Sequence, residues 1–233
     1  MFYYDYYFFV LIIPAMVFAM WAQGAMRSAY ARYSGEPNRN GMTGAQIARR
    51  ILDANGLHDV RVNAVQGQLS DHYNPSTRVV NLSQGVYGAT TVAAAGIAAH
   101  ECGHAIQHAK GYFPLKLRSA AVPVTNIGST LAIPILLVGF FFDLPGLVNL
   151  GLVGYSLVAI FQLITLPVEF NASRRAMAVI ASEGLLEPSQ QPGAQKVLTA
   201  AALTYVAALV SALAQLLRLV LIARGRSGRN NRR

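Results

Sequence analysis

Three residues of one short segment have the types and spacing of a metal-dependent hydrolytic site. His100, Glu101 and His104 form a single His-Glu-x-x-His motif, within a run of alanine and isoleucine residues that favours a helix. Helical residues four apart lie one turn above each other, so both imidazoles can bind one ion, and zinc is the expected metal. Glu101 projects about 100° away around the axis, too far to be a ligand. It is the expected general base, which takes a proton from a water molecule at the metal.

The neighbours of the motif have other expected roles. Gly103 costs about 1 kcal/mol inside a helix, which predicts the close approach of a facing backbone or of substrate. Cys102 is the single cysteine, so it forms no intrachain disulfide, and we expect it to pack rather than to react. His108 lies about 6 Å further along the axis than His104, so it is not expected as a ligand.

The distribution of apolar residues predicts a membrane protein. Hydrophobic residues make up 54% of the 233 residues and charged residues only 12%. Four uncharged stretches approach or exceed the roughly 20 residues that cross a hydrocarbon core: residues 6–23, 119–142, 144–168 and 197–217. The first starts with aromatic and acidic residues, so we expect an uncleaved anchor rather than a signal peptide. The spans contain almost no ionisable residue, which argues against a transporter or channel.

The net charge of +9 does not indicate nucleic-acid binding, because basic residues gather beside the apolar stretches. Five follow directly after the last stretch, where anionic lipid headgroups are the nearer partner: Arg224, Arg226, Arg229, Arg232 and Arg233. Eight flank spans on the side expected to carry the motif: Arg27, Arg32, Lys110, Lys116, Arg118, Arg174, Arg175 and Lys196. This count favours an active site on the cytoplasmic face, although the arginine tail on the other side opposes it.

The third metal ligand must come from outside the motif helix, and Glu169 is the candidate. Glu169 closes the third apolar stretch, whereas Asp143 sits in the tight turn between the second and the third. A hairpin of two spans returns the chain to the side it left, so Glu169 arrives beside the histidines and Asp143 stays across the bilayer. The alternative role for Glu169 is an interfacial carboxylate that caps a helix.

Helix start signals and the alternation of apolar and polar residues predict the helices and strands between the first two spans. Thr43 is the expected N-cap of an amphipathic helix that stops before Gly56, and Thr90 or Thr91 begins the motif helix, which ends before Gly111. Residues 60–65 and 78–83 alternate like half-buried strands and could form a small antiparallel sheet.

Further candidates surround the motif. Substrate could add to an edge strand made of Arg78, Val79, Val80, Asn81 and Leu82, although a purely structural strand is an equal alternative. Candidates for transition-state stabilisation are His72, Tyr73, Arg174 and Arg175. Candidates for hydrogen-bond support of the ligands are Ser173, His108 and Asn171.

The quoted segments resemble a known family. Ala-Ala-His-Glu-x-Gly-His-Ala-Ile-Gln-His, Asp-His-Tyr-Asn-Pro and Val-Glu-Phe-Asn-Ala-Ser-Arg-Arg-Ala are similar to segments of the YugP-like bacterial neutral zinc metallopeptidases, distant relatives of the HtpX-like and CAAX-processing peptidases. The resemblance covers most of the chain. It implies a gluzincin-type membrane endopeptidase with one Zn2+ bound by His100, His104 and Glu169, and with Glu101 as the base. In the HtpX-like relatives an aspartate four residues after the ligand glutamate supports a ligand histidine; here Ser173 occupies that position.

The expected architecture is a mostly α integral membrane protein with four transmembrane helices and a small α+β zincin-like catalytic domain. Its expected parts are an anchor (1–23), a catalytic region (24–118) with the metal-binding helix at 91–109, a helical hairpin (119–168), a second catalytic helix and linker (169–193), a C-terminal span (194–223) and a basic tail (224–233). The expected partners are the lipid bilayer and a peptide or membrane-protein substrate. The alternative function is a catalytically inactive membrane scaffold, but structural zinc usually has four protein ligands and only three are found.

Overall fold

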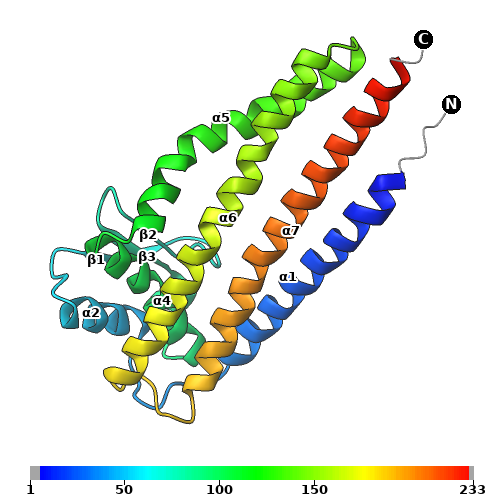
Figure 1. Cartoon of the computed structure of the whole chain (residues 1–233). Helices are drawn as coiled ribbons and strands as arrows, with labels where there is room; N and C mark the ends of the chain where they lie inside the picture. Colours follow the sequence, from blue (N-terminus) through cyan, green and yellow to red (C-terminus); the bar gives the residue numbers. More distant parts are fainter. Residues whose placement is uncertain (1–5, 231–233) are drawn as a thin grey trace. The chain divides into compact units, whose positions relative to one another are not determined.

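The computed structural model describes residues 6–230, which are mostly helical (Figure 1). Four helices are long and apolar enough to cross a membrane: Phe8–Ser34, Phe113–Phe141, Pro145–Ser182 and Gln191–Gly225. The first combines a π-helical segment, η1 (Phe8–Ile12), with α1 (Ile13–Ser34), and the others belong to α5 (Phe113–Phe141), α6 (Pro145–Ser182) and α7 (Gln191–Asn230). The predicted class, a mostly α membrane protein with a small sheet region, is confirmed. The start of the predicted anchor, and Arg232 and Arg233 of the predicted tail, lie outside the described residues.

The chain forms two compact units, each built from several segments. Residues 1–22, 117–166 and 204–233 form one, which we call the span unit; residues 23–116 and 167–203 form the other, the sheet unit. Helix α6 continues without a break through Pro167. The predicted third span and the predicted second catalytic helix are therefore two parts of one helix.

In the span unit, α5 and α6 form a closely packed hairpin. The turn between them contains Asp143, which has a φ of 52°. A Cβ atom on Gly139 would lie 2.8 Å from the backbone nitrogen of Val148, and one on Gly154 would lie 3.3 Å from the carbonyl oxygen of Gly128. Glycines at these positions let the two helix backbones approach closely, as small residues commonly do between membrane helices.

The sheet unit packs short helices against a three-stranded sheet. Its remaining elements are α2 (Gly44–Ala54), β1 (Arg61–Val65), β2 (His72–Asn74), β3 (Val79–Ser83), α3 (Gln84–Tyr87) and α4 (Val92–Ala109). Thr43 is the N-cap of α2, as predicted, and forms a capping box with Gln46. Fully buried apolar residues of α2, β3 and α4, such as Ile47, Leu82 and Ala98, share one core. This core holds α4 in place.

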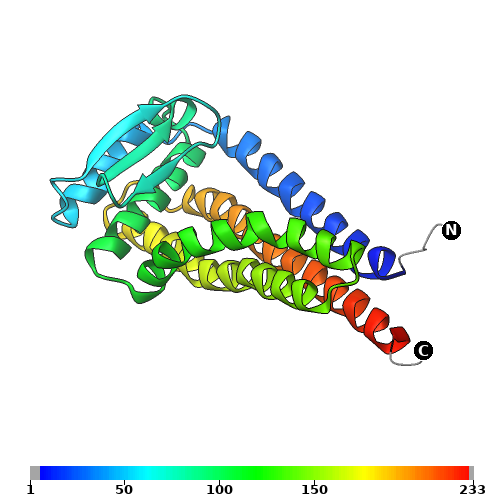
Figure 2. The same ribbon diagram turned by 90° about the horizontal axis from the view of Figure 1, so that it is seen from above.

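The strand order of the sheet is β1-β3-β2 (Figure 2). Strand β1 pairs with β3 in parallel, whereas β2 pairs with β3 antiparallel, so the sheet is mixed rather than antiparallel as predicted. Strand β2 was missed because it is only three residues long and directly precedes a turn.

The prediction that Arg78, Val79, Val80, Asn81 and Leu82 form an edge strand is wrong. Strand β3 is the central strand: β1 pairs with all five of its residues, and β2 pairs with residues 79–81 on the other side. Most of the predicted segment therefore offers no free edge to a substrate. Its first predicted residue, Arg78, precedes the strand with a φ of 53° and pairs with Asp59. The free edges of the sheet belong to β1 and β2.

Candidate metal centre

Helix α4 carries two of the three predicted ligands. Its N-cap is Thr91, one of the two predicted threonines, and the Thr91 hydroxyl accepts a hydrogen bond from the amide of Ala94. His100 and His104 follow on adjacent turns. Their ring centroids are 4.8 Å apart and their planes are nearly perpendicular, at 87°. The helix therefore presents two imidazole nitrogens to one point, as its spacing predicts.

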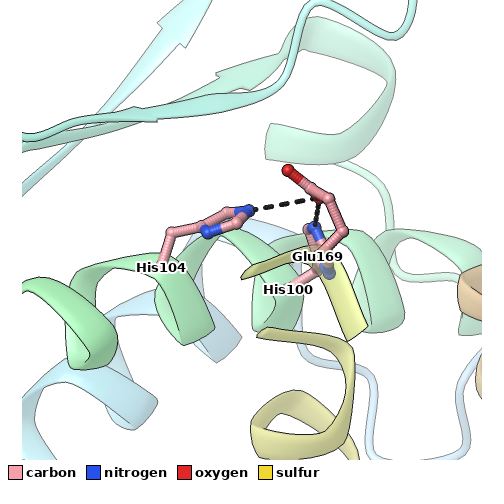
Figure 3. A group of neighbouring side chains, drawn as sticks. All are labelled: His100, His104 and Glu169. Carbon is pink, nitrogen blue, oxygen red and sulfur yellow. Dashed lines mark ion pairs between the residues drawn. The ribbon is translucent and has the colours of Figure 1, made fainter. Parts of the chain in front are cut away.

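Glu169 approaches this pair from α6 (Figure 3). Its Oε2 atom lies 3.3 Å from Nε2 of His100 and 3.6 Å from Nε2 of His104. Zinc–ligand bonds of about 2.0–2.2 Å at tetrahedral angles place ligand atoms roughly 3.3–3.6 Å apart. All three ligand atoms lie within 4.8 Å of one another. The donor set and its spacing thus fit a zinc ion, and three donors leave one coordination position open.

Gly103 explains how α6 can come so close to α4. A Cβ atom at this position would lie only 2.6 Å from the carbonyl oxygen of Ala172, which belongs to α6. The predicted reason for a glycine here, the close approach of a facing backbone, is confirmed. Because Glu169 lies one turn before Ala172 on the same helix, this contact brings the carboxylate to the histidines.

The second ring nitrogen of each histidine also has a partner. Oγ of Ser173 lies 3.1 Å from Nδ1 of His100, so this serine is placed to support the histidine by a hydrogen bond. Nδ1 of His104 lies 3.0 Å from Oε1 of Gln107. Sequence reasoning missed Gln107 as a partner. A signal existed in the sequence, because Gln107 is an uncharged polar residue three positions after a ligand in an apolar helix. In the structure its side chain is completely buried.

Glu101 lies outside the three-residue cluster and is held by the sheet. One of its carboxylate oxygens, Oε2, accepts a hydrogen bond from the backbone amide of Tyr73 at 2.9 Å. Glu101 is buried, with 8% of its surface exposed. Among the described residues, its other oxygen has no hydrogen-bond partner. The arrangement presents one carboxylate oxygen with a fixed orientation beside the proposed ligands.

The remaining candidates divide into those that reach the site and those that do not. The hydroxyl of Tyr73 lies 2.8 Å from Nδ1 of His108, and burial raises the pKa of Tyr73. His72 is exposed and contacts Ser70 and Asn81 instead. His72 thus lies on the outer surface of β2, whereas Tyr73 faces α4.

The two candidate arginines of α6 differ in their exposure and contacts. Arg174 is exposed. Arg175 donates a hydrogen bond from Nε to Oδ1 of Asn171 at 2.7 Å and lies 6.0 Å from the ring centroid of Tyr112. Asn171 in turn accepts a hydrogen bond from Gln107, which contacts His104. Arg175 is therefore connected to a proposed metal ligand through Asn171 and Gln107.

Local electrostatics favour positive charge at the cluster. Burial lowers the pKa of His104, but the hydrogen bond with Glu169 and the charge of Glu101 outweigh burial and hold that pKa above its ordinary value. A cluster that favours a bound proton in this way also favours a bound cation. Cys102, by contrast, has a pKa raised by burial, and its Sγ lies 3.5 Å from the carbonyl oxygen of Ala48 on α2. This is the packing environment that was predicted for the thiol.

Comparison with known proteins agrees with this geometry. Residues 8–224 match the family described as "Putative neutral zinc metallopeptidase". The chain is 47% identical to the "Putative membrane protease YugP" of Bacillus subtilis (strain 168) over 215 residues, which cover 92% of this chain and 96% of that relative. No solved structure matches the chain. With a family match over nearly its whole length and a zinc-compatible donor set, the chain belongs to this neutral zinc metallopeptidase family.

Proposed function

We propose that the protein is a membrane zinc endopeptidase in which His100, His104 and Glu169 bind one zinc ion and Glu101 is the general base. The observation that carries this proposal is that the two buried glutamates, Glu169 and Glu101, occupy different positions at the site. Glu169 lies against both imidazoles, whereas Glu101 lies outside the cluster and is oriented by a backbone amide. An inactive scaffold with a structural metal would not need this second, oriented carboxylate.

The proposed reaction is hydrolysis of a peptide bond. A zinc ion held by the three ligands supplies Lewis-acid polarisation of the scissile carbonyl and lowers the pKa of water. Glu101 accepts the proton of the attacking water through the oxygen that Tyr73 leaves free, and then transfers it to the leaving amine. The hydrogen bond from Tyr73 keeps the carboxylate from rotating away during both transfers.

A peptide substrate is proposed to lie along β2. This strand is an edge of the sheet, and its residue Tyr73 directs its amide to Glu101 rather than to β3. An extended peptide added at this edge would pass the general base with its backbone. The bilayer is the second proposed partner, because four helices of the chain are apolar enough to span it.

The test of this function is the Glu101→Gln variant, assayed with a casein or fluorogenic peptide substrate with and without chelator. We expect the variant to retain one zinc per chain and to lose peptidase activity, because an amide cannot accept the proton. Glu183→Gln is the matched control, since Glu183 is also a glutamate of the sheet unit but lies outside the site. Full activity in purified Glu101→Gln protein would refute the role of the base. Zinc-loaded wild-type protein with no activity on any peptide would favour the scaffold.

We propose a cytoplasmic active site, supported by the eight cations that flank the spans on that side. His58 offers a place to test this, because 73% of its side chain is exposed. A cysteine introduced by His58→Cys should resist an impermeant thiol reagent in intact cells and react after lysis. Labelling of intact cells would place the site outside.

A further inference from the structure

Gln107 links the two helices that carry the metal ligands. Its side chain is completely buried, and its amide nitrogen donates two hydrogen bonds, to the carbonyl oxygen of Val168 at 2.8 Å and to Oδ1 of Asn171 at 3.0 Å. Its amide oxygen lies 3.0 Å from Nδ1 of His104. One side chain of α4 therefore joins His104 to the turn of α6 that contains Glu169.

The direction of each of these hydrogen bonds is determined by chemistry. A backbone carbonyl only accepts, so the group of Gln107 that faces Val168 must be its NH2. An arginine only donates, so the atom of Asn171 that contacts Arg175 must be its oxygen, and that same oxygen faces the Gln107 amide. Gln107 thus cannot turn its amide around, and its oxygen must face His104.

This fixed direction decides which nitrogen of His104 carries hydrogen. Because the oxygen of Gln107 can only accept, Nδ1 of His104 must be the donor. In the neutral imidazole the other nitrogen, Nε2, then has a free lone pair, and Nε2 is the atom that faces Glu169 and the proposed metal position. His100 is less constrained, because its partner is the rotatable hydroxyl of Ser173, which can donate or accept.

We propose that Gln107 is a positioning residue for the metal: anchored by Val168 and Asn171, it holds His104 in the tautomer that binds zinc through Nε2. The inference rests on the proposed zinc site and deepens it. It assigns to the hydrogen-bonded side chains of Arg175, Asn171 and Gln107 the function of orienting His104, rather than only of packing α4 against α6.

The first test compares zinc affinity, measured by chelator competition, in the full-length detergent-solubilised protein. Gln107→Leu removes the hydrogen bonds but keeps a similar volume, and we expect zinc affinity to fall about 10- to 100-fold. The matched control is Gln190→Leu. Gln190 is another buried glutamine of the sheet unit, and it bonds the carbonyl of Pro37 and the amide of Arg39. The Gln190→Leu variant should have lower stability but unchanged zinc affinity. Equal zinc affinity in Gln107→Leu and the control would overturn the proposal.

The second test uses Asn171, where only the oxygen of the amide is needed. Asn171→Asp keeps an acceptor for both Gln107 and Arg175, so zinc affinity should stay close to the wild-type value. Asn171→Leu removes one of the two acceptors that anchor the Gln107 amide and leaves only the Val168 carbonyl to hold it, so zinc affinity should fall. Equal losses in both variants would overturn the proposal, because the acceptor oxygen that aspartate keeps and leucine lacks would then make no difference to zinc binding.

The third measurement is direct. In zinc-loaded protein with 15N-labelled histidines, the His104 signal should show a protonated Nδ1 with a slowly exchanging proton, and Gln107→Leu should lose this slow exchange. A wild-type Nδ1 without hydrogen would overturn the inference while leaving the zinc site intact. If the wild-type protein bound no zinc, the proposed function itself would fail, so the two failures are distinguishable.

Discussion

Replacing Gly103 with alanine tests the geometry of the whole metal centre. The new methyl carbon would lie 2.6 Å from the carbonyl oxygen of Ala172, whereas relaxed carbon–oxygen contacts are about 3.3–3.6 Å. Helices α4 and α6 would have to separate by roughly 0.7–1.0 Å to relieve the clash. The obstacle is backbone, so no side-chain rotation can relieve it.

The expected effects on stability and on zinc binding are unequal. Overpacking costs about 1–3 kcal/mol, but alanine recovers about 1 kcal/mol of helix propensity, so the net loss of stability should be about 0–2 kcal/mol. Metal–ligand distances tolerate only about 0.2 Å, so a shift several times larger should detach Glu169 from the ion. We expect zinc affinity to fall more than the roughly 100-fold that loss of a supporting hydrogen bond can cost.

The assay is chelator competition for zinc alongside thermal unfolding, with Gly96→Ala as the control. Gly96 is on the same helix, and a Cβ there would lie 3.3 Å from the Cβ of Ala194 and no closer than 3.5 Å to its backbone. This control should bind zinc normally. If Gly103→Ala bound zinc within about threefold of wild type, a difference below 1 kcal/mol, the argument that this glycine sets the ligand geometry would be refuted.

Four further outcomes follow from local features of the sheet unit. Thr91→Ala should cost about 1 kcal/mol of stability in denaturant unfolding, because it removes the N-cap of α4, while zinc affinity stays unchanged. Cys102 should not react with a thiol reagent at pH 8 until the protein is unfolded, because burial raises its pKa; rapid labelling of folded protein would contradict this. Zinc affinity should fall as the pH drops through the raised pKa of His104, because zinc needs the neutral imidazole. In zinc-free protein the pH dependence has the opposite sign. The raised pKa of His104 stabilises the folded state fully below the unfolded-state pKa of about 6.5, and this stabilisation is lost as the pH rises through the folded-state pKa. Unfolding curves measured across pH would show this loss.

Much of the candidate site could be predicted because its determinants are local. The start of α4 at Thr91 and the spacing of His100 and His104 depend only on neighbouring residues and helical geometry. Glu169 could be predicted from topology, since two apolar stretches joined by a tight turn bring the chain back. Even Gly103 indicated, by its cost in a helix, that another backbone lay against it.

Other parts could not be predicted because their partners are distant in the chain. The position of β3 between β1 and β2 depends on pairing across loops, and alternation of residues does not encode strand order. Tyr73 was expected only as a candidate for transition-state stabilisation, yet its amide holds Glu101, 28 residues away. Gln107 bonds Val168 and Asn171, which are 61 and 64 residues away.

The amino-acid sequence by itself determined the identity of the chemical groups, the helix that presents two of them and the four apolar helices, because residue type, spacing and hydropathy act over a few turns of chain. Only the tertiary structure decided which strand borders the base, how close Glu169 comes to His100 and His104, and which amide orients a ligand. Those outcomes depend on packing between elements, where a glycine in one helix and a carbonyl in another set distances that neither segment specifies alone.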